Sequence, residues 1–342
     1  MASAPGVIAQ FADAVDVAIQ KYWLKPTTEK TEYFRSMYNV TTGVEDYYLK
    51  DSGISGLSSA SRMHEQGVVV AEVPVQTNSQ TYTQERFGLL LSFSWFMWKF
   101  GIKKRNVQNI VNELKKACYT RREELLARKY DAAHLSSYTE NDDKGNYTVT
   151  TTGGDGDFMA TATHPNESGG TDWSNLISDG TTTNLKLDYA GLKALWRTAA
   201  RVTNPKGKIF DCSPNRIIVK KSSTPAFKAR EILYAIKNSR IPEEFSHDGS
   251  AVPSFELVEN PYLLGTGDTT STTNLSYETN WHAIDTSKLN DMYGAQYKES
   301  SPISLDAQNI VYKTDEIQYK ATLCFDYGHN DARGTFHSEG DN

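Results

Sequence analysis

The sequence has few cysteines, and their spacing builds no recognisable site. Cys118, Cys212 and Cys324 are the only cysteines among 342 residues, and they lie far apart. An odd, widely spaced set supplies neither a disulfide framework nor the paired spacing of a structural zinc site. The sequence therefore predicts folding in a reducing compartment and excludes the class of small disulfide-stabilised domains.

Long apolar runs are also missing. The best run, residues 87–100, is interrupted by small polar residues and by Lys99, and it is shorter than the roughly 18 residues of a membrane span. The first 24 residues have no basic start and carry Asp13 and Asp16 inside their apolar part, which argues against a secretory signal. Apolar residues recur there at helical spacing, so an amphipathic helix is predicted.

No excess of positive charge is present. The chain has 36 Lys and Arg against 42 Asp and Glu, a formal net charge of −6. A protein that grips nucleic acid through its phosphates needs a concentrated basic surface. The densest basic stretch, residues 103–105, opens a predicted helix whose later turns mix both signs, and a solvated helix face is the favoured interpretation.

Catalytic motifs are missing as well: the sequence has no glycine-rich nucleotide loop, nucleophile elbow or zinc-binding helix motif. Weak candidates are the pair His64-Glu65, the aspartates Asp155 and Asp157 of "GGDGDF", and the distant histidines His329 and His337. We interpret them as a strand entry, a turn and unrelated terminal residues. The sequence thus predicts no catalytic residue, no cofactor and no metal site, and it favours a structural role.

Several segments look unable to bury themselves. Residues 25–63 are polar and aromatic with weak periodicity, which is typical of an arm lying over another surface. A β-hairpin is predicted next, with strands 68–75 and 82–93 joined by the uncharged tip "QTNSQT". Because a lone two-stranded hairpin is marginal in water, this one needs a further surface to lie against.

The remaining chain shows clearer periodicity. A long helix is predicted over 103–134, about 45 Å at 1.5 Å per residue, followed by a mainly irregular region over 135–185. One face of this helix should carry an apolar stripe of Val107, Ile110, Val111, Leu114, Ala117, Cys118 and Leu125. Asp188 should cap a helix, residues 216–220 should form a buried strand, and Thr224 should cap a helix that buries Phe227. Further strands are expected at 254–263 and 280–285, and a long alternating strand should end the fold near residue 328.

The order of these segments resembles the major capsid proteins of tailed phages, which have the Hong Kong 97-type fold, and within them the Mu-like major head subunit proteins. The resemblance is carried by "HEQGVVVAEVPVQTNSQTYTQERFGLLLSFSW", the helix ending "RKYDAAHL", the segment "GDGDFMATATHP", and "LDYAGLKALWRTAARVTNPKGKIFDCSPNRIIVKKSSTPAFKAREIL". It covers residues 60–240 well and the ends loosely.

The resemblance implies an α+β fold in four parts. These are an N-terminal helix and arm (1–55), an extended β-hairpin loop (56–94), a peripheral domain with its spine helix (95–185 with 300–342), and an axial domain (186–299). It also implies a shell of pentamers and hexamers around double-stranded DNA, in the virion after assembly in the host cytoplasm.

Inter-subunit contact is expected along the extended loop, at Val73, Val75, Tyr82, Arg86 and Phe87. Separate scaffolding and portal proteins, and possible cement proteins, are the expected partners. DNA should be enclosed without sequence-specific binding. Residues 65–98 contain no lysine, so the covalent subunit linkage of some family members is not expected.

Two alternatives remain open from the sequence. An encapsulin-like nanocompartment shell has the same fold and would hold protein cargo instead of a genome. A soluble α/β enzyme is the second alternative, and it would be monomeric or dimeric with a ligand in its α/β block.

Overall fold

The computed structural model describes residues 5–24, 32–54, 76–94, 104–142, 145–166, 171–237, 253–263, 279–306, 309–311 and 315–340. The helices are α1 (Pro5–Trp23), α2 (Phe34–Met37), α4 (Lys104–Asp131), α5 (Tyr189–Ala199), α6 (Thr224–Lys237) and α8 (Thr286–Asn290). The strands are β1 (Asn39–Thr42), β2 (Tyr48–Ile54), β3 (Gln76–Thr83), β4 (Glu85–Ser94), β5 (Ser137–Asp142), β6 (Gly145–Thr150), β7 (Arg216–Lys220), β8 (Glu256–Asn260), β9 (Trp281–Ile284), β10 (Ala295–Leu305), β11 (Asn309–Val311), β12 (Glu316–His329) and β13 (Thr335–Ser338).

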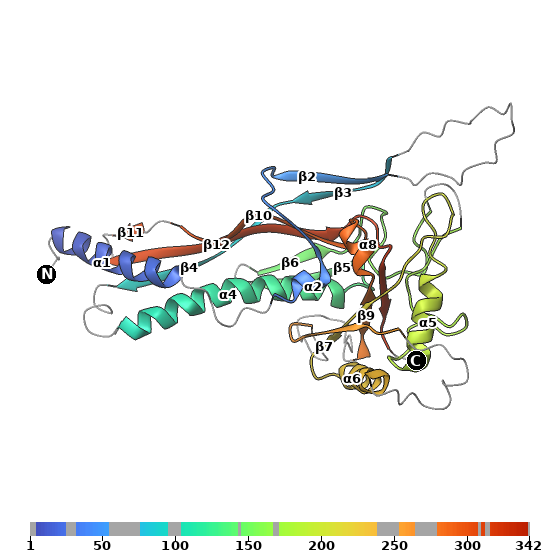
Figure 1. Ribbon diagram of the computed structural model, residues 1–342. Helices are drawn as coiled ribbons and strands as arrows, with labels where there is room; N and C mark the ends of the chain where they lie inside the picture. The colour runs from blue at the N-terminus through green and yellow to red at the C-terminus, as the bar shows by residue number, and fades with distance from the viewer. Residues whose placement is uncertain are drawn as a thin grey trace, which may run out of the picture.

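The first of two units is elongated. In its five-stranded sheet, β1 pairs with β10, and β10 and β11 both pair with β12. Strand β4 pairs with the other edge of β12. Helix α4 runs the length of the sheet on one face (Figure 1). At one end of this unit α1 packs beside α4 and β12, where Val15, Ile19, Val111 and Tyr319 share a buried cluster. The predicted N-terminal helix is confirmed.

The alternating strand predicted near the C-terminus is β12, and it lies at the centre of this unit. Its alternate residues Ile317, Tyr319, Ala321, Leu323 and Phe325 are all buried, at most 1% exposed. Alternate side chains of a strand point to one face, so this set forms the side of the sheet that packs on α4. The prediction that the strand returns to the domain of the long helix is confirmed.

The long helix α4 also matches its predicted apolar stripe. Val107, Val111, Leu114, Cys118 and Leu125 are buried, at three- and four-residue spacing. Ala117, which was expected in the same stripe, is exposed because it lies beside rather than on this face.

The predicted hairpin is wrong in its pairing. Its expected tip, residues 76–81, is part of strand β3, which pairs antiparallel with β2. Its expected second strand is mostly β4, which pairs along its whole length with β12 of the same chain. The threonines and the tyrosine of "QTNSQTYT" favour extended backbone, and polar side chains suit a two-stranded ribbon that is open to water.

The ribbon β2–β3 stands apart from the large sheet (Figure 1). Ile54 and Gln76 are the last paired residues at its far end. Residues 55–75, with the predicted strand 68–75, lie outside the described residues.

The predicted arm is only partly an arm. Phe34, Met37 and Tyr38 are at most 2% exposed and belong to the main core of their own chain. Strand β1 then pairs in parallel with β10. Aromatic residues without clear periodicity indicate a loosely attached segment, but the short helix α2 is enough to insert Phe34, Met37 and Tyr38 into the core.

The second unit holds a four-stranded sheet, β13-β9-β7-β8, with α5 and α6 nearby (Figure 1). Strand β7 has the predicted bounds, and the Asp188 side chain accepts a hydrogen bond from Gly191 N at 2.7 Å, as predicted for the cap of α5. Strand β13 comes from the far C-terminal segment that was assigned to the other domain, and it pairs with β9.

Two predictions at α6 are wrong. Ser223, not Thr224, supplies the cap, because its Oγ accepts from Ala226 N at 3.3 Å. Phe227 is 59% exposed rather than buried, since the inner face of α6 is formed by Ala226, Ala229 and Ile232.

The region 135–185 was predicted to be mainly loop, yet it opens with the hairpin β5–β6. Strand β10 was not predicted at all. It is an eleven-residue strand. Its pairing with β12 shifts register between Glu299 and Ser304, as at a β-bulge, and Pro302 lies in this irregular part.

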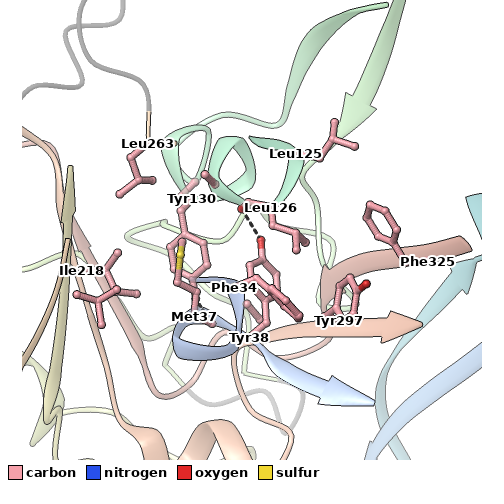
Figure 2. Close-up of a cluster of buried hydrophobic side chains, with 14 of the residues drawn as sticks. Phe34, Met37, Tyr38, Leu125, Leu126, Tyr130, Ile218, Leu263, Tyr297 and Phe325 are labelled. Carbon is pink, nitrogen blue, oxygen red and sulfur yellow. Dashed lines mark hydrogen bonds between the residues drawn. The ribbon is translucent and has the colours of Figure 1, made fainter. Parts of the chain in front are cut away.

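The main core joins the two units. Leu125, Leu126 and Tyr130 of α4 lie in one cluster with Ile218 of β7, Leu263 and Phe325 (Figure 2). In Figure 2, Met37 and Tyr38 lie between the helix and the strands, and Tyr38 Oη donates to Leu126 O at 2.8 Å. Of the helices that the structure describes, none is long and apolar enough to cross a bilayer.

Candidate assembly surface

The five residues predicted to contact a neighbouring subunit fall into three groups. Val73 and Val75 lie outside the described residues. Tyr82 and Phe87 pack inside their own chain, and Arg86 lies on the surface. None of these placements tests contact with another copy, so the inter-subunit role stays a prediction.

Tyr82 anchors the ribbon to the large sheet. Tyr82 is 1% exposed, and its ring lies close to Gly328 of β12. The contact is tight: a Cβ atom added to Gly328 would lie only 3.3 Å from Cε1 of the tyrosine ring. The ammonium group of Lys298 lies 5.7 Å from the centre of the ring. Burial raises the pKa of the Tyr82 hydroxyl, so this side chain is neutral.

A second buried contact fixes the same end of the ribbon. Thr83 N donates to Asp326 Oδ2 at 2.6 Å, and Lys298 Nζ lies 3.6 Å from Asp51 Oδ2. Burial raises the pKa of Asp326 to about 6, against the opposing effect of its two backbone hydrogen bonds. The ribbon is therefore held firmly at one end, and its far end carries the residues 55–75 that join β2 to β3.

Phe87 and Arg86 lie at the start of β4 on opposite faces of the sheet. The Phe87 ring stacks on Phe325, with centroids 4.9 Å apart, on the side of the core. Arg86 points outward, with its side chain 59% exposed, and forms an ion pair with Asp306 at 3.2 Å.

Strand β4 leaves one edge without a partner strand among the described residues. Natural edge strands carry charges, prolines or bulges that block further pairing. Residues 87–94 carry no charge and no proline, and their register with β12 has no shift. Leu89 and Leu90 are 44% and 55% exposed on this strand. Their exposure marks a surface suited to another protein.

Aromatic side chains are exposed at two further places. Tyr47 and Tyr48 pack edge to face, with centroids 4.5 Å apart, at the base of the ribbon, and both are more than half exposed. Phe227 and Tyr234 are exposed two turns apart on α6. The spacing of Phe227 and Tyr234 on one helix face could have revealed this second place from the sequence.

No arrangement typical of a catalytic or metal site emerges in the part of the chain that the structure describes. No group of three or more His, Cys, Asp or Glu residues there could hold a metal ion. Asp155 Oδ2 lies 2.8 Å from His164 Nδ1, so the predicted turn "GGDGDF" is fixed by this buried pair. His64 and Glu65 lie outside the described residues, and Ser223 acts as a helix cap.

No protein-family model and no curated protein matches this chain. Solved structures do match it. The capsid structure of the cyanophage P-SCSP1u is similar with a TM-score of 0.51 and 10% identity, over 93% of this chain and 93% of that one.

Two further similar structures have lower TM-scores. One is the satellite phage P4 procapsid that includes the size determination (Sid) protein, with a TM-score of 0.45 and 11% identity over 96% of this chain and 90% of that one. The other is the capsid of Myoviridae phage XM1, with a TM-score of 0.45 and 10% identity over 92% of this chain and 94% of that one. At 10% identity the cyanophage likeness establishes the fold. The predicted α+β, Hong Kong 97-type capsid fold is confirmed.

Proposed function

We propose that this protein is the major capsid protein of a tailed phage. In this role it assembles as pentamers and hexamers into an icosahedral shell that encloses double-stranded DNA. The observation that carries the proposal is the likeness to the cyanophage capsid, which extends over 93% of both chains. A match of that extent includes both units of the subunit, so the similarity is not confined to one common unit.

The exposed features of the subunit support this role. A shell closes through many repeated heterologous contacts, and each specific interface needs about 1,000 Å² of buried surface. We assign three parts of the chain to contact with neighbouring copies: the segment that joins β2 to β3, which contains Val73 and Val75, the outward Arg86, and the open edge at Leu89 and Leu90. Tyr82 and Phe87 would act indirectly, by holding the ribbon and β4 in position.

The proposed role is structural rather than enzymatic. The net charge of −6 suits an inner wall that does not hold DNA phosphates tightly. The proposed partners are copies of the same chain, a separate scaffolding protein and a portal protein, with cement proteins as optional further partners. The proposed location is the virion, after assembly in the host cytoplasm.

A shortened ribbon tests the proposal. Because Ile54 and Gln76 are paired neighbours, a short Gly/Ser turn can replace residues 55–75 without disturbing β2 or β3. We expect the variant to stay folded, with an unfolding temperature within a few degrees of the wild-type value, but to form no closed shell by negative-stain microscopy. A second variant with 21 Gly and Ser residues in place of 55–75 separates the loss of length from the loss of the valine-rich sequence. Shells of wild-type size from the shortened variant would refute the assignment of the ribbon as an assembly element.

A further inference from the structure

Buried histidines gather where α4 meets the four-stranded sheet. The chain has seven histidines, and the structure describes five of them. His164, His282, His329 and His337 are at most 1% exposed. His134 is half-buried, but its Nε2 atom is sealed from solvent and has no hydrogen-bond partner.

Two of these histidines form a pair. His282 of β9 and His337 of β13 are opposite each other in the antiparallel register. Their Nδ1 atoms are 2.9 Å apart, which is hydrogen-bond distance. One ring must donate and the other must accept, so the bond requires a proton on only one of the two Nδ1 atoms. If both rings are protonated, two donors face each other and the bond is lost.

In the part of the chain that the structure describes, the ionisable groups that act on the pair are other histidines, which would add positive charge. Tyr130 of α4 faces both rings, with centroids 5.4 Å from His282 and 6.1 Å from His337. His134 approaches His337 to 6.3 Å from the turn after α4, and His164 and His329 add further like charge if they are protonated. The charged groups nearby act elsewhere: Asp155 faces His164 and His329, Lys129 faces His329, and Arg216 faces Tyr130.

This environment favours the neutral rings. Burial lowers the pKa of His282 to about 3 and of His134 to about 4, and it lowers the pKa of His337 well below its usual value. In an opened state these rings would be solvated, with pKa values near 6.5. The opened state therefore binds more protons below about pH 6.5, and the closed state loses stability as the pH falls through that value.

The pair lies where α4, the α2 segment and the four-stranded sheet meet. Tyr130 touches both histidines and also donates from its hydroxyl to Met37 O at 2.6 Å, so it links α4, the α2 segment and the four-stranded sheet. We propose that the His282–His337 pair is an acid-sensitive latch that holds the four-stranded sheet against the end of α4 near neutral pH and releases it when both rings are protonated. The latch lies within one subunit and does not depend on the proposed capsid role.

Hydrogen exchange of the full-length chain, followed by mass spectrometry between pH 7.5 and 4, tests the latch. After correction for the pH dependence of intrinsic exchange, protection in peptides covering β9 and β13 should fall by up to about a hundredfold per pH unit below about pH 6.5, one factor of ten per histidine. Peptides from the central part of β12 should keep their protection over the same range.

Variants sharpen the test. The double variant H282Q/H337Q has no titrating pair, so β9 and β13 should lose most of their pH dependence. The control H329Q removes another fully buried histidine outside the pair and should open at the same pH as the wild type.

Three results would overturn the latch. They are equal loss of protection in β9, β13 and β12, no loss down to pH 4, and an unchanged pH dependence in the double variant. If the double variant does not fold, the wild-type comparison of the two sheets decides the question.

Discussion

At the scale of single residues, Tyr130 combines burial with a specific hydrogen bond. Its side chain is fully buried, and its hydroxyl donates to Met37 O. Tyr130→Phe keeps the ring and leaves that carbonyl without its donor, so we expect a loss of about 1–2 kcal/mol in the free energy of unfolding, measured by urea denaturation. Tyr48→Phe is the matched control, because Tyr48 is 64% exposed, and it should change stability by less than about 0.5 kcal/mol. Equal effects of the two substitutions would contradict the assigned role of Tyr130.

Glu123 is a buried carboxyl group that stability measurements can detect. It is 3% exposed, and its Oε2 atom accepts from Phe34 N at 3.1 Å. Burial raises its pKa to about 7, although neighbouring Arg122 opposes the shift. The folded state thus binds more protons than the unfolded state between about pH 4.5 and 7, and this group's contribution to stability is lost as the pH rises through that window.

Glu123→Gln removes this titration while keeping an oxygen acceptor for Phe34 N. Between pH 5 and 8 the stability of the wild type should therefore fall relative to that of Glu123→Gln, by about 1–3 kcal/mol. Denaturation at both pH values measures the difference. Glu124→Gln, on the same helix, is the control for the loss of one carboxylate. A constant difference between wild type and Glu123→Gln would contradict the raised pKa, because it would mean that Glu123 binds the same number of protons in the folded and unfolded states.

At the scale of elements, Ser223 and Thr224 are the two candidates for the residue that caps the start of α6. The structure gives the capping role to Ser223, whose hydroxyl also donates to Lys220 O at 2.7 Å. Ser223→Ala should cost about 1 kcal/mol of unfolding free energy, and Thr224→Ala should cost clearly less. Chemical denaturation of both variants checks this order, and the reverse order would restore the cap predicted from the sequence.

The open edge of β4 predicts a defect in assembly without a defect in folding. Leu90 is 55% exposed, and it faces Lys320 of β12 across the strand pair. Leu90→Glu places a carboxylate opposite that lysine, so the folded subunit should keep its stability within about 0.5 kcal/mol. The new charge on a contact surface should reduce the yield of shells at least tenfold by sedimentation. Ile209→Glu, at an 81% exposed apolar residue of the second unit, is the control. Normal shells from Leu90→Glu would remove β4 from the set of contact surfaces.

The periodic patterns of the sequence correctly predicted the elements that bury one continuous face. The alternation in β12 and the helical stripe of α4 come from one buried face each, and the cap of α5 comes from the local chemistry of Asp188. These features are local, so the sequence contains them directly.

Other features depend on distant partners and could not be predicted. The polar strand β3 pairs with β2 rather than with the adjacent β4, and β4 finds its partner in β12, more than 200 residues away. His282 and His337 are brought together by strand pairing across 55 residues. The burial of Tyr82 depends on β12, which no local pattern indicates.

At the scale of the whole molecule, the subunit satisfies most of its own core and leaves specific parts exposed. Strands β1 and β4 are built into the chain's own sheet, contrary to the sequence interpretation, and α2 into its core. Among the described residues, buried contacts hold the ribbon near Thr83, and the β4 edge has no partner strand. In this account, neighbouring copies are needed to cover these surfaces rather than to complete the fold.

Electron microscopy of the purified full-length chain at micromolar concentration, with its scaffolding partner where one is needed, tests the capsid role most directly. The account predicts closed particles of uniform diameter built from many copies of the chain. A population of monomers or dimers alone, under conditions where the chain is folded, would contradict it.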